Sequence, residues 1–570
     1  MKFIIVTILL LVLIKCYSQT TTFNNIIFDT LPNLVLNIEV LDSGYALIGA
    51  TAFTNFDRYV IIKFVDNNGI YKWKKLFGEV NIKYWGGTQN SFIKTYDNGY
   101  VLAGQKVNLQ TGKNAVLLMK FNQYFDTVWT KTYLTDTLFV ASYQCVQADD
   151  GGFALVGTIQ KPPSSSLPKT LLIKIDSMGN MLWHKEFSYP TYQAFNITKS
   201  YDGGFVIGGM STNDDWGLIK TDSLGNQKWI KTIGNPNWDD SRVMGLITTK
   251  DSCYIITGPY GINKINYENV YKSHIVKINN NGDIIWDKIY YETYFPNNHP
   301  IGDTIYSYFN SVIETDDGSL YATGVKQHNN TNVYSKLYKF NSSGDTIWSR
   351  EFPLQAYFAY LETLKSTSDG GFILAGWGDT FYYSPTQQAW LVKTNCIGFD
   401  SQPLADYSFI VDSNNITLNN LSQKVDSCIW DFGDGSPLLY SHICDSVSHI
   451  YADTGSYSVS LIAYNGCTIA DNDTITKQII IGTSKIDDIN FNNSELSIYP
   501  NPSSGQLTIK TTTEAIEAIE VFNCIGSKID EIIVKAIYNS YIYNSKNLNG
   551  LYFIKVKTKV NVYTTKVIFQ

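Results

Sequence analysis

The feature that most constrains this chain is a phrase that returns seven times along its first 400 residues. It opens on Asp, turns through Gly or Asn, and enters an apolar run that closes on Gly, as in DGGFALVG at Asp150. A fixed period of about fifty residues is the signature of a repeat architecture, in which each unit buries its faces against its neighbours. The opening residues are Asp42, Asp97, Asp150, Asp202, Asp251, Asp317 and Asp369.

Each unit continues with a second phrase, in which Lys, Asp or Asn, Gly and finally Trp follow one another at fixed spacing. Alternating apolar residues joined by Asp-Gly or Asp-x-x-Gly turns predict two hairpins, and therefore a four-stranded antiparallel sheet. We expect the Gly that closes each first phrase to lie where backbones crowd. We expect the tryptophans to wedge between neighbouring sheets rather than to stack on sugars. They are Trp73, Trp129, Trp183, Trp229, Trp286 and Trp348.

The seventh unit lacks a Trp-bearing strand, because the chain runs from Asp400 into Ser-Gln-Pro. We predict that residues 21–30 supply this strand and close the ring, which removes an open sheet edge. The fold class we predict is all-β, with a seven-bladed β-propeller over residues 19–400. The second phrase resembles the tryptophan-docking repeats of quinoprotein-like propellers, and the whole unit resembles the DGG repeats of bacterial secreted proteins. This resemblance implies a scaffold, with no cofactor and no active site.

The N-terminus predicts export. Lys2 precedes an apolar run, residues 3–14, that is too short to span a bilayer and ends near small residues, so residues 1–18 read as a signal peptide. Two alternatives are a lipoprotein anchored at Cys16, which Lys15 disfavours, and a buried apolar element. We expect no transmembrane segment in the mature chain. Export permits a disulfide, and one pair among Cys428, Cys444 and Cys467 is the candidate.

Residues 401–484 carry a different pattern, in which CIWDFGDGS is followed by the strand-like GSYSVSLIAY. These motifs resemble a PKD domain, an immunoglobulin-like β-sandwich that serves as a spacer or a binding module. The residues that carry the resemblance are Trp430, Asp431, Phe432, Gly433, Asp434 and Gly435.

Residues 485–494 read as a polar linker, and residues 495–570 as a further β-sandwich with alternating apolar residues, among them Val521, Ile529 and Val560. This last segment resembles the type A C-terminal sorting domain of the bacterial type IX secretion system. The resemblance implies the secretion machinery as a partner, passage across the outer membrane, and release into the medium or display on the outer cell surface. The matching residues are Tyr499, Pro500, Asn501, Pro502, Gly505, Gly550, Tyr552 and Lys566.

Residues that could carry chemistry are sparse. The six histidines have no ligand spacing, and the motifs HExxH, GxSxG and CxxC do not occur, so we predict no metal and no catalytic residue. Only three arginines are present and the net charge is −7, so the chain lacks the basic surface that a nucleic-acid-binding protein needs. Enzyme activity stays uncertain, and binding is favoured over it.

Long loops rich in Tyr and Asn interrupt the repeat, above all at residues 291–309 and 377–390. Aromatic and amide side chains on loops can stack on and hydrogen-bond to sugars or peptides, so these loops are the candidate ligand site. The residues are Tyr291, Tyr294, Phe295, Tyr306, Tyr308, Trp377, Phe381, Tyr382 and Tyr383.

The leading hypothesis is therefore an exported protein whose propeller is a binding or adhesion platform for an extracellular glycan or protein. A polysaccharide hydrolase or lyase is the first alternative, and it requires carboxylates that converge across the channel. A structural component of a surface matrix is the second.

Overall fold

The structure is a computed structural model. It describes residues 21–29, 33–52, 58–135, 139–162, 167–188, 191–211, 215–234, 242–265, 268–290, 305–328, 332–354, 359–379, 387–441, 444–466, 471–482, 496–534, 538–545 and 548–570. The predicted signal peptide and the predicted linker lie outside the described residues. In the part of the chain that is described, all 43 elements are β-strands.

The repeat region forms four-stranded antiparallel sheets, as the sequence predicts. The strands of units 1 and 2 belong to one nine-stranded sheet, because β4 of unit 1 and β6 of unit 2 are joined by a single parallel residue pair, Arg58 with Lys83. Their strands are β2 (Asn33–Leu41), β3 (Gly44–Ala52), β4 (Arg58–Asp66), β5 (Tyr71–Phe77), β6 (Ile82–Trp85), β7 (Phe92–Lys94), β8 (Tyr100–Asn108), β9 (Asn114–Phe121) and β10 (Thr127–Tyr133).

Units 3 to 7 form five separate four-stranded sheets. Their strands are β11 (Phe139–Gln147), β12 (Phe153–Gln160), β13 (Lys169–Ile175), β14 (Met181–Phe187), β15 (Thr191–Lys199), β16 (Phe205–Ser211), β17 (Trp216–Thr221), β18 (Gln227–Ile233), β19 (Gly245–Thr248), β20 (Tyr254–Ile265), β21 (Glu268–Ile278), β22 (Ile284–Tyr290), β23 (Ile305–Glu314), β24 (Leu320–His328), β25 (Asn332–Phe340), β26 (Thr346–Phe352), β27 (Ala359–Ser366), β28 (Phe372–Asp379), β29 (Gln387–Thr394) and, from the N-terminus, β1 (Phe23–Ile27).

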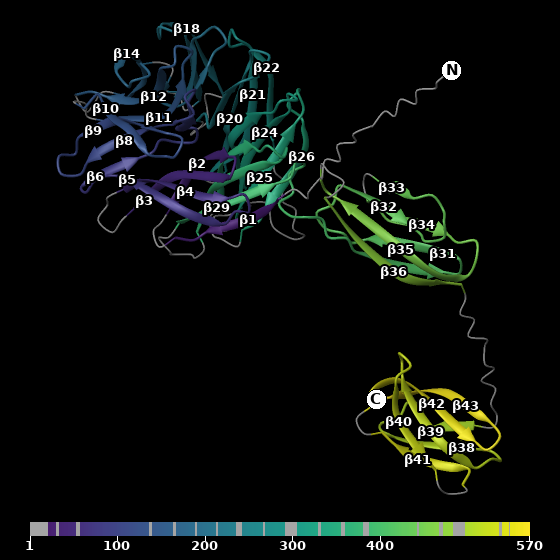
Figure 1. Ribbon diagram of the computed structural model, residues 1–570. Coiled ribbons are helices and arrows are strands. Elements are labelled where there is room, and N and C mark those ends of the chain that lie inside the picture. Colours follow the sequence, from purple (N-terminus) through teal and green to yellow (C-terminus); the bar gives the residue numbers. More distant parts are fainter. Residues whose placement is uncertain are drawn as a thin grey trace, which may run out of the picture. The chain divides into compact units, whose positions relative to one another are not determined.

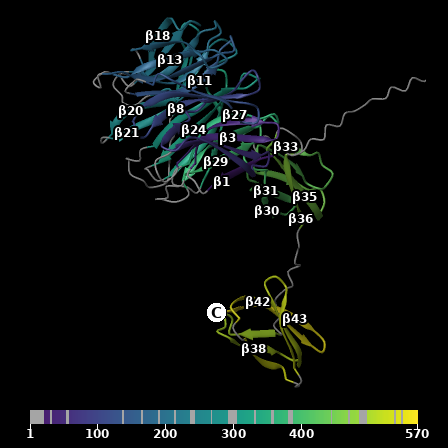
Figure 2. The same ribbon diagram turned by 60° about the vertical axis from the view of Figure 1, so that its left-hand side comes forward.

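The sheets follow one another in a ring. The first strand of each unit contacts the first strand of the next, and β27 of the last unit contacts β2 of the first. These first strands are therefore the inner strands of the ring. Both ribbon views show β1 and β29 side by side although they are far apart in the sequence (Figures 1 and 2). The arrangement is consistent with a propeller.

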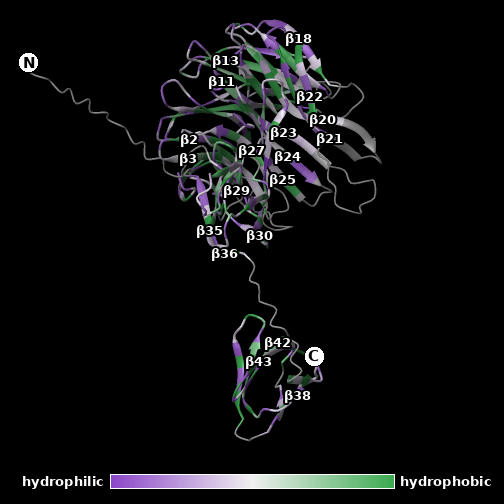
Figure 3. Ribbon diagram, turned by 90° about the vertical axis from the view of Figure 1, so that its right-hand side faces the viewer, coloured by the Kyte–Doolittle hydropathy of each residue, from purple (hydrophilic) through white to green (hydrophobic). Residues whose placement is uncertain are grey.

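The predicted ring closure is confirmed by the pairing of β1. This strand is antiparallel to β29, with Phe23 opposite Lys393 and Ile27 opposite Ala389. The seventh sheet thus takes its outer strand from the N-terminus, and its edge is covered. The middle strands, such as β13 and β17, are buried along almost their whole length, because neighbouring sheets pack on both of their faces. Figure 3 shows the hydrophobic and hydrophilic residues along the strands.

Five of the six tryptophans lie between adjacent sheets, over a turn glycine of the next unit, whereas Trp73 packs against Phe125 at the equivalent turn. A Cβ placed on Gly225 would lie 2.6 Å from the ring of Trp183, and one on Gly398 would lie 2.7 Å from Trp348. Both glycines have positive φ, so the turn conformation and the covering ring both select Gly. At the closure, Phe23 of β1 covers Gly69 in the same way and takes the place of the missing tryptophan.

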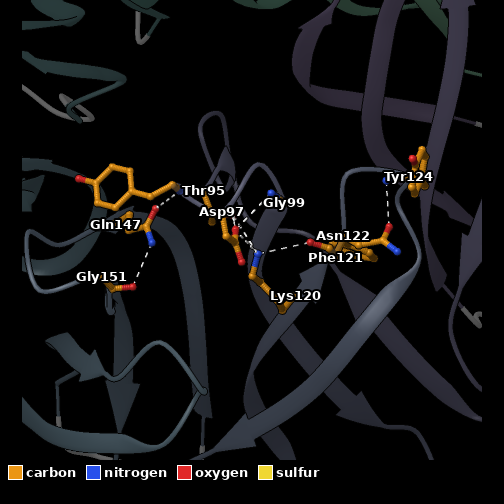
Figure 4. Close-up of polar contacts among 10 residues, drawn as sticks. Thr95, Asp97, Gly99, Lys120, Phe121, Asn122, Tyr124, Gln147 and Gly151 are labelled. Carbon is orange, nitrogen blue, oxygen red and sulfur yellow. Dashed lines mark hydrogen bonds and ion pairs between the residues drawn. The ribbon is translucent and has the colours of Figure 1, made fainter.

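In five of the seven units, the turn Asp of the first phrase and the Lys of the second phrase meet within one sheet. Asp97 and Lys120 lie 2.8 Å apart, and Thr95 Oγ1 and Gly99 N–H donate to the same carboxylate (Figure 4). A buried ammonium needs such a partner, because an unpaired charge is costly away from water. The equivalent pairs are Asp150 with Lys174, Asp202 with Lys220, Asp251 with Lys277 and Asp369 with Lys393.

The segment with the Trp-Asp-Phe-Gly-Asp-Gly motif forms a three-stranded and a four-stranded sheet. Trp430 is fully buried with its ring 5.1 Å from Tyr407. Gly433 has a φ of 74°, and a Cβ there would lie 2.5 Å from the Ser458 carbonyl, so the motif requires Gly. The strands are β30 (Tyr407–Asp412), β31 (Asn415–Asn420), β32 (Ser427–Asp431), β33 (Leu439–Ser441), β34 (Val447–Ile450), β35 (Gly455–Tyr464) and β36 (Asn472–Ile481).

The C-terminal segment also forms a three-stranded and a four-stranded sheet around its own core, which includes Val521, Val556 and Val567. Two residues expected in the alternation, Ile529 and Val560, are exposed, because one lies on the edge strand and the other in a turn. The strands are β37 (Leu496–Tyr499), β38 (Gln506–Thr511), β39 (Ile516–Asn523), β40 (Lys528–Ile533), β41 (Ser540–Asn544), β42 (Gly550–Thr558) and β43 (Val562–Phe569).

The cysteines differ from expectation where they are described. Cys428 and Cys444 are free, and Cys396 at the end of the seventh unit is disulfide-bonded. Cys467 lies outside the described residues. Within the described residues, no helix is long and apolar enough to cross a membrane.

Candidate functional site at the bulges of the inner strands

Five of the inner strands carry a β-bulge at the same place in the repeat. In each, the residue before the bulge pairs with the glycine that closes the first phrase, as Leu361 does with Gly376. A Cβ on Gly376 would lie 1.8 Å from the Tyr360 carbonyl oxygen, so only glycine admits this approach. The prediction that these glycines lie where backbones crowd is confirmed for four of the five, whereas Gly324 faces the rings of Tyr338 and Phe309. The bulged residues are Leu36, Tyr143, Phe195, Asn310 and Glu362.

A bulge re-aims a side chain out of the strand alternation, and bulges are frequent next to functional sites. Here Leu36, Phe195, Asn310 and Glu362 line one cavity of 190 Å³. A second cavity of 340 Å³ shares Phe195, Arg242, Met244 and Tyr308 with it. The two cavities together form what we call the bulge site. Its walls come from several inner strands, so no single unit contains it.

Amide side chains fix these walls by bridging neighbouring inner strands. Asn196 donates to the Val243 carbonyl at 2.7 Å, and Gln144 donates to the Gln89 carbonyl at 2.8 Å. Both amides are buried. Hydrogen bonds between the inner strands of different units hold the bulged residues in register around the site.

Glu362 is the carboxyl group of the bulge site. Its Oε2 accepts a hydrogen bond of 2.7 Å from Gln89 Nε2. Burial raises the pKa of Glu362 above its ordinary value, although hydrogen bonds from Gln89 and Trp377 and the charge of Arg242 oppose this. Among the described residues that line the two cavities, Glu362 is the only carboxylate. Paired carboxylates for acid and base catalysis are therefore not supplied by these walls.

The remaining groups of the site are aromatic or donate hydrogen bonds. The guanidinium of Arg242 lies 5.4 Å from the ring centre of Phe195. Burial and the nearby Glu362 raise the pKa of the Tyr308 hydroxyl, which makes it a hydrogen-bond donor and a poor base. Asn310 Oδ1 is buried without a hydrogen-bond partner among the described atoms. The site thus offers a cation, an aromatic face and an unused acceptor.

Two of the nine aromatic residues predicted to bind a ligand lie at this site. Tyr308 lines both cavities, and Trp377 packs its ring 4.7 Å from Tyr360 and interacts with Glu362. Tyr306 belongs to β23. The other six, Tyr291, Tyr294, Phe295, Phe381, Tyr382 and Tyr383, lie outside the described residues.

Sequence reasoning missed Phe195, Arg242, Asn310 and Glu362. Three of them are bulged residues, and a bulge leaves no mark on the alternation of a single strand. The glycine opposite each bulge is a repeated position in the sequence, but the sequence does not show which strand pairs with it. Arg242 carried a signal, since it is one of only three arginines.

The predicted sorting residues gather near the last strand. Asn501 donates to the Lys566 carbonyl at 3.0 Å and accepts from Ile568 N–H at 2.9 Å, which ties the Pro-Asn-Pro turn to β43. Tyr552 packs its ring 5.7 Å from Phe569. Gly505 and Gly550 have positive φ, whereas Tyr499 and Lys566 are exposed and Pro500 and Pro502 lie in the turn.

The acidic residues of the Trp-Asp-Phe-Gly-Asp-Gly motif close turns. Asp431 Oδ1 accepts from Gly433 N–H at 2.9 Å, and Asp434 Oδ1 accepts from Ser436 N–H at 3.0 Å. Such contacts are the ordinary work of Asp in turns. In the described part of the chain, no group of three or more His, Cys, Asp or Glu residues is placed to hold a metal ion.

Comparison with protein families identifies the two C-terminal segments. Residues 497–570 match the secretion system C-terminal sorting domain, and residues 408–481 match the PKD domain. The chain carries a type IX sorting domain and a PKD domain. It is secreted to the outer cell surface or the medium, and its sorting domain implies an interaction with the type IX machinery. No curated protein matches the chain.

Solved structures give distant similarities. The PKD1 domain of the Vibrio cholerae metalloprotease PrtV is 26% identical over 15% of this chain and 100% of its own, with a TM-score of 0.13. The polysaccharide lyase Uly1 is 11% identical over 67% of this chain and 94% of its own, with a TM-score of 0.41. The structure of Drosophila Plexin A in complex with Semaphorin 1b is 8% identical over 66% of this chain and 88% of its own, with a TM-score of 0.36.

Proposed function

We propose that the protein is an exported binding protein whose residues 19–400 form a seven-bladed β-propeller, and that the bulge site holds a saccharide. The sorting domain, residues 495–570, carries the chain out of the cell. Residues 401–484, the PKD segment, act as a spacer between the sorting domain and the propeller. The ring of sheets and its closure by β1 support the propeller.

The observation that carries the proposal is the set of groups around Glu362. Arg242 offers donors, Asn310 Oδ1 offers a buried acceptor that is not otherwise used, and Phe195 offers an aromatic face. Sugars present hydroxyl groups around the edge of an apolar ring face, so they need this mixture of donors, acceptors and aromatic surface. The guanidinium also suits an acidic sugar, because it pairs with carboxylates.

Binding without turnover fits these groups better than hydrolysis or elimination. Glu362 is the one carboxylate among the described residues of the cavity walls, and the raised pKa of Tyr308 keeps this hydroxyl protonated, so it is not available as a base. The described walls do not supply the second carboxylate that glycoside hydrolysis uses.

The test is binding of the purified secreted chain to an array of extracellular polysaccharide fragments, followed by titration calorimetry on the fragments that bind. We expect Arg242→Ala and Phe195→Ala to weaken binding at least about tenfold, as for central residues of an interface. Arg350→Lys is the control, since Arg350 stacks on Trp348 and Phe399 away from both cavities.

Each outcome of this test decides for or against a saccharide at the bulge site. No binding to any fragment, or binding that the Arg242 and Phe195 variants leave unchanged, overturns the proposal. Release of shorter fragments during incubation replaces it with the enzyme hypothesis.

A further inference from the structure

The turn ends of the inner strands surround a larger cavity, of 610 Å³, that the bulge site does not include. Its walls come from β7, β11, β15 and β19, three or more residues beyond the bulged positions on β11 and β15. Two tyrosines, Tyr96 and Tyr201, and two lysines, Lys94 and Lys199, line it. We call it the turn-end cavity. Its volume lies within the range of small-ligand sites.

The side chains of this cavity are not required by the repeat. Tyr96 and Tyr201 each stand just before the turn Asp of their unit, where the other units carry Leu41, Asp149, Lys250, Asp316 and Ser368. The turn itself is made by the Asp, the glycine and the preceding Thr or Ser. Tyr96 is 65% exposed and Tyr201 is 67% exposed. Their hydroxyl groups make one contact each across units, with Lys199 Nζ and with the Lys250 carbonyl, and most of each ring stays exposed to a ligand.

The charge of the cavity walls is positive. Lys199 Nζ lies 2.6 Å from Asp149 Oδ1 and 3.2 Å from the Tyr96 hydroxyl. Lys94 is exposed and forms no ion pair among the described residues. Two lysines against one aspartate leave an excess positive charge beside the aromatic rings, which attracts an anionic group.

Backbone groups at this end are already paired. The Thr95 N–H donates to Gly99 O, and equivalent bonds close the turns at Ala148 and Ser200. A peptide that binds by strand addition needs a row of free backbone groups along a strand, whereas these strands end in closed turns. Recognition here rests on rings and lysines, which suits a sugar face that carries a sulfate or carboxylate.

We propose that the turn-end cavity is a second ligand site, which binds an acidic saccharide between Tyr96 and Tyr201 with its anionic group on Lys94 and Lys199. This site is independent of the bulge site, so either can exist without the other. A chain with both can hold two segments of polysaccharide, or two chains, at once.

The test uses the full secreted chain and two probes of equal length, a dextran sulfate oligosaccharide and an uncharged dextran oligosaccharide, in titration calorimetry at low and high salt. We expect the sulfated probe to bind at least about tenfold more tightly, and its affinity to fall as salt rises. Lys94→Gln and the double variant Tyr96→Ala/Tyr201→Ala each weaken it at least about tenfold.

The controls separate this site from others. Tyr440→Ala removes a tyrosine of equal exposure in the PKD segment, and Lys228→Gln removes an exposed lysine of β18; both should leave the affinity unchanged. Binding that Arg242→Ala removes and that Lys94→Gln leaves intact belongs to the bulge site and does not count for this one. No binding of the sulfated probe, equal binding of both probes, or affinity that survives the Lys94 and Tyr96/Tyr201 changes overturns the proposal.

Discussion

The ring of Phe23 covers Gly69, with its Cε2 atom 2.9 Å from the position that a Cβ on this glycine would take. The two residues belong to different sheets, and the contact joins the N-terminal strand to the first unit. It repeats the tryptophan-on-glycine contact found at five other junctions between units, with Phe in place of Trp. This contact makes the closure of the ring depend on the N-terminal strand.

Phe23→Ala should therefore destabilise the ring. Truncation of a buried phenylalanine costs about 3 kcal/mol in the free energy of unfolding, through lost burial and a remaining cavity. Urea unfolding followed by tryptophan fluorescence measures it. Phe28→Ala is the control, since Phe28 is 71% exposed and its loss should change stability by less than about 0.5 kcal/mol. Equal effects of the two variants would contradict a closing role.

The pair formed by Asp369 and Lys393 should be costly to break from one side. Lys393 is 1% exposed, and its Nζ lies 2.9 Å from Asp369 Oδ2. Asp369→Asn leaves a buried ammonium without its counter-charge, which costs about 3 kcal/mol. Asp316→Asn, at a fully exposed pair with Lys250, should cost less than about 1 kcal/mol. Similar unfolding midpoints for the two variants would refute the distinction.

Stability should fall in acid through the turn carboxylates. Burial by itself raises the pKa of Asp97, but Lys120, Thr95 and Gly99 together lower it to about 2, and the pKa of Asp251 is also lowered to about 2. An Asp in an unfolded chain has a pKa of about 3.9. Because the folded value is the lower one, the stabilisation is complete above about pH 4 and is lost as the pH falls from there towards about 2.

Urea midpoints measured across this acid range check the expectation. Asp97→Asn should show a smaller loss between neutral and acid pH than the unchanged protein, because it has one fewer carboxylate to protonate. A midpoint that does not change with acid in the unchanged protein would show that these pairs contribute nothing.

The bulges should be sensitive to the glycines opposite them. Gly376→Ala places a methyl group 1.8 Å from the Tyr360 carbonyl, so the inner strand must move and Glu362 with it. We expect a loss of about 1–3 kcal/mol in stability and weaker ligand binding at the bulge site. Gly455→Ala is the control, since its nearest neighbour beyond the adjacent residues is 3.6 Å away. If Gly376→Ala behaves like this control, the glycine is not what shapes the bulge.

Export should depend on the C-terminal segment. Deletion of residues 496–570 removes the sorting domain and should leave the protein inside the outer membrane, whereas deletion of residues 408–481 should leave export intact. Immunoblots of periplasmic, surface and medium fractions compare the two. Appearance of the chain without residues 496–570 in the medium would contradict the role of the sorting domain.

The sequence by itself determined the repeating unit, its two hairpins, the contribution of residues 21–30 to the last sheet, and the export signal. Each of these depends on local patterns, such as Asp-Gly turns and alternating strands, or on a motif contained within one segment. It also predicted the crowded glycines, but not that each of five faces a bulge.

Only the tertiary structure decided which residues line the cavities of the proposed ligand site. Glu362, Arg242 and Phe195 stand in three different units and meet because the ring brings inner strands together. Their positions depend on which strand pairs with which, and for Phe195 and Glu362 on the extra residue that a bulge adds to the strand at the wall of the cavity. A strand's own alternation carries no record of that shift, because the bulge is a property of the pair of strands and not of either sequence alone.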